Sequence, residues 1–573
     1  MKKTFISLSV SLLVGSAMSM SAYDFRAGTG TTDDPYQIFT AEDLQHVSDY
    51  TSNSEVAFIV MDDIDLDGVD FQPIASPFFG VFDGNNHVIS NFTNTSGNDG
   101  VGLFARVNTP AVIKNVIMEY ADIVCNRWSG ILISTNGNWE KDGGTVINCH
   151  VRNSNIDGGD AIGGLIGVGG GVVEGCSVEN VSVVGGTDVG GLIGRQEAGV
   201  NYVHNCYFVG DVKGTNNVGG VIGWFRVNRP EGVNAEMYKL AAYGTVTSDG
   251  ENSTAAGIYA YQQGNSSIVA SNLFSDVNVT SPEAGGVAGS PMDGHLYDSY
   301  ALGNITANDG RWAGGIVGTC YNSPETIVGC YNYGSASGTT MFVGGVCGRN
   351  WPGIQIKGCY YNEEGSAKNM GEGHNTADFE ASPLLPEAML DLDNMPGLTA
   401  GAWVNNKGVT TPYLVTQTAP ATITECTTDG IRGTCPEGTT YLVIYTAQLG
   451  AVDKTVTIDG TSWEATWNEE MIPNDLVYVI AKAGDLMPSQ RVSMRMSQGS
   501  GVANIANEND VKVVSGKGYI KVEGATGTYK MYNVAGQCVK AASLNGEVIN
   551  TSSLNKGIYM LVVNGKAHKV AVR

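Results

Sequence analysis

The segment Gly163-Gly164-Leu165-Ile166-Gly167 decides the fold of this chain, because copies of it recur along the sequence. Close copies are Gly190–Gly194, Gly219–Gly223, Gly285–Gly289, Gly314–Gly318 and Gly344–Gly348, and looser ones surround Gly102, Gly130 and Gly257. The second glycines fall at 102, 130, 164, 191, 220, 257, 286, 315 and 345, which are steps of 27 to 37 residues. A period of this size is typical of a stacked repeat protein.

Each repeat also has a second apolar segment, and cysteine recurs at one position of it. The cysteines are Cys149, Cys176, Cys206, Cys330 and Cys359, and the other copies place Val116, Ala242, Asn272 and Ser299 at that position. Free cysteine behaves as a small buried hydrophobe. We therefore expect this column to lie in the core.

Each repeat contains three short apolar segments separated by Gly, Asn and Asp turns, which is typical of one coil of a parallel β-helix. Nine coils stacked at about 4.8 Å make a rod on the order of 40 Å long. No segment of helical period separates the strands, which disfavours a leucine-rich horseshoe. We predict an all-β protein, namely a parallel, right-handed β-helix solenoid followed by a small β-sandwich and a C-terminal β-sandwich-like domain.

The chain divides into seven predicted segments. Lys2-Lys3, the apolar run 5–14 and the small residues that follow indicate a secretory signal peptide. The segments are a signal peptide (1–22), an N-terminal lead-in and cap (23–99), about nine repeats (100–362), a C-terminal cap (363–415), an immunoglobulin-like sandwich (416–498), a linker (499–510) and a C-terminal domain (511–573).

The repeats resemble GLUG repeats, which are named for a glycine–leucine–glycine core. The segment before the repeats strengthens the resemblance through Gly28-Thr29-Gly30, Asp34-Pro35-Tyr36, Asp63-Ile64-Asp65-Leu66 and Phe82-Asp83-Gly84-Asn85. The segment after the repeats strengthens it through Trp403 and Pro412-Tyr413-Leu414. The resemblance implies a bacterial surface protein of adhesin type. Such repeats also flank the catalytic part of an immunoglobulin-A-cleaving metalloprotease.

The C-terminal segment resembles the sorting domain of type IX secretion. The resemblance rests on Tyr532-Asn533-Val534-Ala535-Gly536 and Leu554-Asn555-Lys556-Gly557-Ile558-Tyr559. It implies recognition by the outer-membrane secretion machinery, removal of the tail and attachment of the protein to the cell surface.

The net charge and the hydropathy of the chain exclude several classes of partner. The formal charge of -25 repels nucleic acid and anionic membranes. After the signal peptide no apolar run is long enough to span a bilayer, so we do not expect a transmembrane protein. The predicted localisation is secreted and attached to the cell surface.

The sequence lacks the usual catalytic and metal-binding patterns. None of the seven histidines is four residues from another, so no HExxH metalloprotease motif exists. No serine triad and no column of carboxylates stands out. Asp63, Asp65 and Asp67 begin like a calcium loop, but Ile74 occupies the place of the bidentate glutamate. We therefore predict no enzyme, no catalytic residue, no metal site and no cofactor.

A column of arginines and aromatics is the candidate binding site. Four residues after each second glycine stand Arg106, Ser134, Val168, Arg195, Trp224, Tyr261, Ser290, Thr319 and Arg349, with Tyr321 and Trp351 close by. Such side chains stack on sugars or anchor a protein partner, although loop decoration also accounts for surface aromatics. The candidate ligand-binding residues are Arg195, Trp224, Tyr261, Tyr321, Arg349 and Trp351.

Three functions remain open at this stage. The protein is an adhesin or binding scaffold for a glycan or an extracellular host protein, a β-helix polysaccharide lyase or hydrolase, or a structural spacer without a specific ligand. Outside the repeats, Cys426 and Cys435 are the candidate disulfide pair, and two buried thiols are the alternative.

Overall fold

The computed structural model describes residues 23–497 and 512–572. Gaps fall at 76, 138–141, 227–234, 265–267, 293, 322–325, 340–341, 352–353, 367–369, 374–378, 517–518, 524–526, 534–536, 545–547, 552 and 564–565. The predicted signal peptide (1–22) and linker (499–510) lie outside the described residues.

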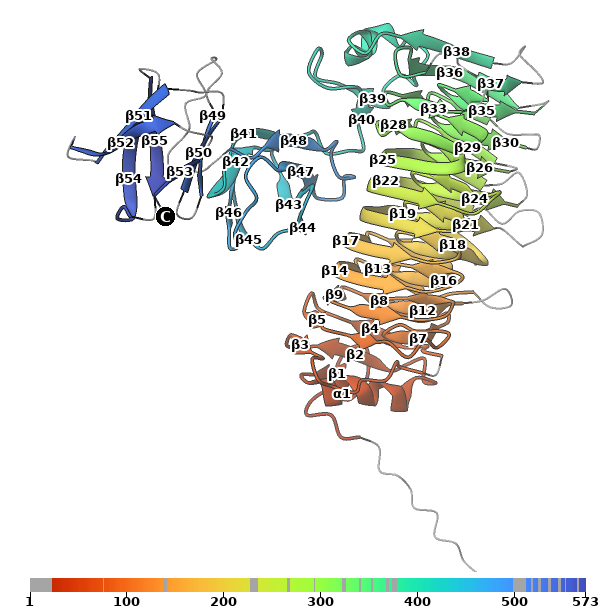
Figure 1. The fold of residues 1–573 in the computed structure, drawn as a ribbon. Coiled ribbons are helices and arrows are strands. Elements are labelled where there is room, and N and C mark those ends of the chain that lie inside the picture. Colours follow the sequence, from red (N-terminus) through yellow and green to blue (C-terminus); the bar gives the residue numbers. More distant parts are fainter. Residues whose placement is uncertain are drawn as a thin grey trace, which may run out of the picture.

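One sheet of 38 strands winds through the chain as a β-solenoid, which is the fold class predicted from the repeats (Figure 1). Its strands pair in parallel with the coil above and below. On the first face the successive partners are β1 (Tyr36–Ile38), β2 (Ala57–Val60), β4 (Val81–Asp83), β8 (Val112–Lys114), β13 (Thr145–Ile147), β16 (Ile166–Glu174), β19 (Ile193–Gly214), β22 (Ala235–Ser248), β25 (Ile268–Gly285), β27 (Gly294–Tyr297), β31 (Thr326–Val328), β36 (Gln355–Asn362) and β38 (Phe379–Leu384). The lead-in strands thus stack under the repeats and extend the same rod.

The other faces are built in the same way, and the long strands β16, β19, β22, β25 and β36 continue around corners. The second face adds β3 (Ile64–Asp65), β5 (Val88–Ser90), β9 (Ile117–Glu119), β14 (His150–Asp157), β17 (Ser177–Val184), β28 (Tyr300–Ala301) and β32 (Tyr331–Asn332), with β6 (Thr93–Asn94), β10 (Asp122–Val124) and β33 (Ala336–Gly338) beyond the bend. The glycine segments supply β11 (Ser129–Gly130), β15 (Ile162–Gly163), β18 (Thr187–Gly190), β20 (Asn216–Gly219), β23 (Thr254–Ala256), β29 (Ile305–Gly314) and β34 (Val343–Gly344). They are followed by β7 (Phe104–Val107), β12 (Ile133–Asn136), β21 (Ile222–Arg226), β24 (Tyr259–Gln263), β26 (Ala288–Pro291), β30 (Val317–Cys320), β35 (Cys347–Asn350) and β37 (Met370–Gly373).

The second glycine of each copy is required by the approach of neighbouring coils. A Cβ on Gly191 would lie inside contact distance of the Gly220 carbonyl oxygen and 2.5 Å from the ring of Phe208. The same clash recurs between Gly220 and Gly257 and between Gly286 and Gly315. Any side chain at this position would force the coils apart, which explains the periodic glycine.

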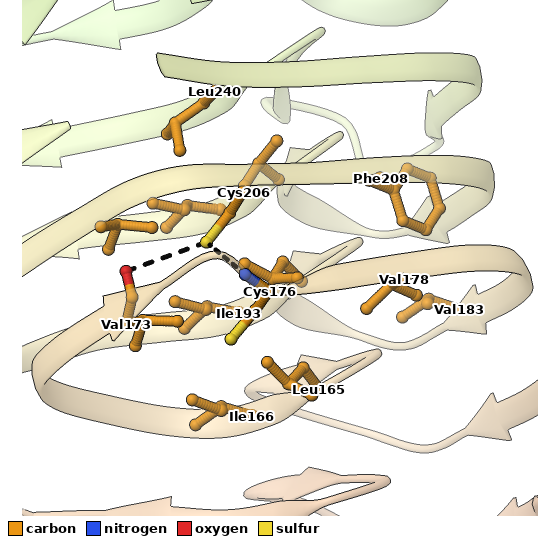
Figure 2. Packing of buried hydrophobic residues seen from close by; sticks show 14 of the residues in the cluster. Leu165, Ile166, Val173, Cys176, Val178, Val183, Ile193, Cys206, Phe208 and Leu240 are labelled. Atoms are coloured by element: carbon orange, nitrogen blue, oxygen red, sulfur yellow. Dashed lines mark hydrogen bonds between the residues drawn. The ribbon is translucent and has the colours of Figure 1, made fainter. Parts of the chain in front are cut away.

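The cysteine column lies in the core, as predicted. Cys149, Cys176 and Cys206 are free thiols with at most 1% of their surface exposed. Figure 2 shows Cys176 and Cys206 packed among Leu165, Ile193 and Val173. The register corrects two assignments. Cys206 pairs with Leu240, and Leu240 pairs with Leu273, so these two leucines occupy the column in place of Ala242 and Asn272.

The residue before each column position turns the chain. This position has a left-handed backbone in coil after coil, with φ of 54° at Asn115, 51° at Asn148, 66° at Gly175 and 52° at Asn205. Asparagine and glycine adopt this region most readily. Between coils the amide of Asn148 donates to Asn115 Oδ1 at 2.9 Å. The sequence therefore encodes each corner as Asn or Gly just before the buried residue.

Short helical segments lie at both ends of the solenoid. Near the N-terminus, α1 (Ala41–His46) and η1 (Val47–Tyr50) follow the cap residue Thr40, whose Oγ1 accepts from Asp43 N at 3.2 Å. At the other end, η2 (Ala388–Leu390) and η3 (Leu392–Asn394) precede the antiparallel pair β39 (Trp403–Val404) and β40 (Tyr413–Leu414).

A two-sheet sandwich follows the solenoid. One sheet has the order β41 (Thr422–Cys426), β42 (Gly430–Thr434), β46 (Ser462–Trp467) and β45 (Lys454–Asp459). The other has β44 (Gly450–Ala451), β43 (Thr439–Thr446), β47 (Leu476–Ala483) and β48 (Val492–Arg495). Ile431, Leu442, Trp463 and Val477 are buried between the sheets.

The predicted disulfide is absent from the structure. Cys426 and Cys435 are both free, buried thiols. In the β41–β42 hairpin Cys426 faces Ile431, whereas Thr434 faces Thr422, so Cys435 lies at the opposite end of the hairpin. Four residues of strand separate the two positions by roughly 14 Å, which is too far for a disulfide.

The C-terminal domain is a smaller pair of antiparallel sheets. One contains β49 (Lys512–Gly516), β50 (Tyr519–Glu523) and β53 (Val548–Asn550). The other contains β52 (Cys538–Leu544), β51 (Gly527–Tyr532), β54 (Gly557–Val563) and β55 (Lys566–Val572). Ile520, Met531 and Leu561 are fully buried between them.

The sandwich folds back against the side of the solenoid (Figure 1). It covers a column of aromatic rings that follow the buried column position, of which Phe274, Tyr300 and Tyr331 stack with centroids 4.5 and 4.9 Å apart. The hydroxyl of Tyr300 donates to Gln417 Oε1 at 2.6 Å, and that of Tyr243 donates to the Ser489 carbonyl at 2.6 Å. Rings that would otherwise face solvent are therefore buried by a segment far away in sequence.

Candidate functional site

The first predicted cluster forms where the strands leave the glycine turn. Arg195 pairs in register with Trp224, and Trp224 pairs with Tyr261, so the three side chains emerge from one face. The guanidinium carbon of Arg195 lies 4.9 Å from the Trp224 ring centroid. The Trp224 and Tyr261 rings meet edge to face at 6.3 Å. All three side chains are half-buried, which leaves part of each surface open to a partner.

A buried carboxylate holds Arg195 in place. Arg195 Nε donates to Asp188 Oδ2 at 2.7 Å, and a second guanidinium nitrogen donates to the same oxygen. The other oxygen accepts from Asn217 Nδ2 at 2.8 Å. Burial raises the pKa of Asp188, and the charge of Arg195 opposes this shift. The arginine is therefore fixed before any ligand arrives, which lowers the entropy lost on binding.

The second predicted cluster gathers around Arg349. Its guanidinium carbon lies 4.5 Å from the Trp351 ring centroid and 4.7 Å from that of Trp312. The Tyr321 and Trp351 rings are 6.1 Å apart. Trp312 was missed from the sequence because it precedes the glycines, whereas only the residues after them were considered. The sequence did contain a signal for this position. Asp188 and Glu283 occupy the same position of their own coils as Trp312, two residues before the first glycine.

The two clusters lie on one edge of the rod. Tyr261, Ser290, Thr319 and Arg349 follow one another in register, so three coil steps separate Tyr261 from Arg349, which is roughly 14 Å at about 4.8 Å per coil. Trp312 and Tyr321 belong to the coil of Thr319 and are two steps from Tyr261. We call this edge, with Arg195, Trp224, Tyr261, Trp312, Tyr321, Arg349 and Trp351, the arginine–aromatic edge. One member of the predicted column was misplaced, because Thr135 rather than Ser134 stands in register with Val168.

A buried glutamate lies beside the second cluster. Glu283 pairs in register with Trp312 and is 3% exposed. Burial raises the pKa of Glu283 to about 7, while Thr319, Arg311 and Arg349 act in the opposite direction. The edge thus contains a carboxyl group that changes charge near neutral pH.

Within the described ranges no group of three or more His, Cys, Asp and Glu side chains is arranged to hold a metal ion. In the same ranges, none of the helices has the length and apolar character needed to cross a membrane.

Comparison with protein families identifies the C-terminal domain. Residues 514–573 match the secretion system C-terminal sorting domain. The protein is therefore exported and attached to the cell surface, and its C-terminal domain interacts with the secretion machinery. The match covers the β49–β55 unit.

Other comparisons give partial likenesses. Halomucin from Haloquadratum walsbyi is 31% identical over 156 residues, which are 24% of this chain and 2% of that protein. A solved structure from Bacteroides ovatus, described as a candidate immunoglobulin A1 protease, has a TM-score of 0.36 at 19% identity over 68% of this chain and 95% of that one. The BSP domain of a biofilm-associated protein has a TM-score of 0.13 at 12% identity, over 26% of this chain and 29% of that one.

One of these comparisons corrects the prediction that the chain is not an enzyme. That prediction is contradicted by the similarity to a structure described as a protease. At this identity and TM-score the likeness transfers no protease activity to this chain.

Proposed function

We propose that this exported surface protein binds an extracellular ligand, a glycan or a host protein, along the arginine–aromatic edge. The observation that carries the proposal is the in-register stack of Arg195, Trp224 and Tyr261, with Arg195 held by the buried Asp188. Arginine, tryptophan and tyrosine dominate the energetics of binding hot spots. A rigid solenoid that repeats such groups suits an extended partner.

The finer assignments belong to the same proposal. The repeats are of GLUG type, the function is that of an adhesin, and the sorting tail is removed when the protein is attached to the surface. The glycine, corner and core columns support a repeat family of this kind. The predicted segment boundaries and the absence of a bound cofactor or calcium are part of the same hypothesis.

Binding to a glycan array and to extracellular host proteins tests the proposal. Trp224→Ala combined with Trp351→Ala should weaken binding at least tenfold while the circular dichroism spectrum stays unchanged. Unchanged affinity in that variant would remove the edge as the binding site. If the intact chain binds no member of either panel, the spacer hypothesis replaces the adhesin.

Cleavage of a polysaccharide is the second candidate function. It is favoured by the position of Glu283 in register with Trp312 on the arginine–aromatic edge, together with the burial that raises its pKa to about 7 and so suits it to donate a proton near neutrality. Release of new reducing ends from a polysaccharide panel would support it. The Glu283→Gln variant should then lose this release, and the candidate fails if the variant is as active as the wild type.

A further inference from the structure

We propose that a cleft between the solenoid and the sandwich binds a neutral sugar unit of a glycan, with Tyr120 as the stacking platform. The cleft has a volume of about 470 Å³. Its solenoid wall consists of Glu119, Tyr120, Asn153 and Asn180, and its sandwich wall of residues 451–454 and Glu469. This site lies away from the arginine–aromatic edge and does not depend on it.

Hydrogen bonds at and beside the cleft join the solenoid to the sandwich. Glu179 is 5% exposed and accepts from the Tyr207 hydroxyl at 2.5 Å and from the Tyr441 hydroxyl of the sandwich at 2.9 Å. Asn180 Oδ1 accepts from Ala451 N at 2.9 Å. The cleft is therefore preformed, as sites at domain interfaces commonly are.

Tyr120 occupies a position where its neighbours carry asparagine. Glu119, Arg152 and Glu179 stand in register, so the residues that follow them form one column. The backbone there is left-handed, with φ of 55° at Tyr120, 50° at Asn153 and 54° at Asn180. Asparagine adopts this conformation far more readily than tyrosine. A tyrosine that is 56% exposed at this position is explained by neither the turn nor the core.

The side chains that line the cleft favour a sugar as the ligand. An exposed ring offers a flat apolar surface to the C–H face of a pyranose. The surrounding carboxylates accept hydrogen bonds from hydroxyls, and the Asn153 amide nitrogen can donate one. The Asn180 amide orients this group, because its Nδ2 donates to Asn153 Oδ1 at 3.1 Å. Glu119, Asp453 and Glu469 outnumber Arg152 and Lys454 around the cleft, which disfavours anionic sugars. A volume near 470 Å³ accommodates one or two sugar units.

Calorimetry of the full chain with methyl glycosides of glucose, galactose, mannose and N-acetylglucosamine tests this inference, with glucuronate as the anionic comparison. At least one neutral glycoside should bind, and glucuronate should bind at least tenfold more weakly. Tyr120→Asn should weaken binding at least tenfold without lowering the melting temperature, because asparagine suits the turn. Tyr120→Phe should retain binding, since the ring is kept.

A matched variant separates the role of Tyr120 from that of an exposed tyrosine elsewhere. Tyr519→Ala removes an exposed tyrosine of the C-terminal domain and should leave glycoside affinity unchanged. The inference is overturned if no neutral glycoside binds or if Tyr120→Asn binds as tightly as the wild type. A lower melting temperature in Tyr120→Asn together with unchanged affinity would assign Tyr120 a structural role.

Discussion

Arg491 of the sandwich donates to Asp276 of the solenoid, with 2.8 Å between Nη2 and Oδ1. Both side chains are largely buried, at 19% and 12% exposure. Arg491 also donates to the Tyr445 hydroxyl at 3.1 Å. Burial raises the pKa of Asp276, and the charge of Arg491 opposes this shift. This pair joins residues 215 apart in sequence and fixes the sandwich to the side of the rod.

Removing Arg491 should loosen the sandwich. Arg491→Ala leaves Asp276 buried without its counter-charge, and we expect a loss of about 3–5 kcal/mol in the free energy of unfolding. Urea unfolding followed by tryptophan fluorescence measures the loss. Arg495→Ala, at the exposed last position of β48, is the control and should stay within about 0.5 kcal/mol of the wild type. An equal effect of both variants would contradict the role of the pair.

The stability of the solenoid should fall as the pH rises toward neutrality and above. The pKa of Glu283 is raised from 4.5 to about 7 in the folded chain. Its contribution is complete below pH 4.5, where the carboxyl is protonated in both states, and is lost as the pH rises through 7. The loss is on the order of 3 kcal/mol.

Glu283→Gln should remove this pH dependence and make the protein more stable than the wild type at pH 8. Thermal unfolding between pH 4 and pH 9 gives the measurement. Glu437→Gln, at an exposed position of the sandwich, should keep the wild-type profile. Identical pH profiles for Glu283→Gln and the wild type would show that the carboxyl is not buried as described.

A methyl group at the second glycine should be far more damaging than a larger residue at the corner. Gly191→Ala drives a Cβ into the Gly220 carbonyl and the Phe208 ring, and we expect a loss of about 3 kcal/mol or more. Gly175→Asn introduces the residue found at the same corner in the adjoining coils and should change stability by less than about 0.5 kcal/mol. Chemical denaturation compares the two, and the reverse order would refute the coil-contact argument.

Thiol accessibility should separate one cysteine from the other ten. Cys538 is exposed, and the other ten cysteines are buried. Burial raises the pKa of Cys149 and of Cys426, the latter to about 12, and only the thiolate reacts. A thiol reagent should therefore modify one cysteine per native chain and eleven in denaturant. Cys538→Ser should abolish the native reaction, whereas nine thiols in denaturant would indicate a disulfide.

Part of the candidate site could be predicted from the repeat register. Arg195, Trp224 and Tyr261 follow the glycines at a constant spacing, and in a parallel stack a constant spacing means neighbouring positions. Trp312 and Glu283 also stand at a constant spacing, two residues before the first glycine of their copies, in the same column as Asp188. They reach the same edge from the strand before the glycines, and only the turn itself brings the two strands together.

The sequence by itself determined the solenoid. Each coil contacts only its neighbours. The period, the glycine spacing and the buried cysteine column are therefore local patterns that can be read directly from the linear sequence. Even there the column was misread at Leu240 and Leu273, because these two copies have leucine where the others have smaller residues.

Only the tertiary structure decided where the sandwich lies and what it encloses. The outward rings of Tyr300 and Tyr331 indicate that something covers them, but no periodic pattern says which segment does so. The cover comes from residues 411–417 and 487–491, and the cleft beside Tyr120 exists because Tyr441 and Ala451 return to the solenoid. Such contacts depend on the fit between two surfaces that do not repeat. That fit is determined by residues far apart in the sequence, so no local pattern predicts it.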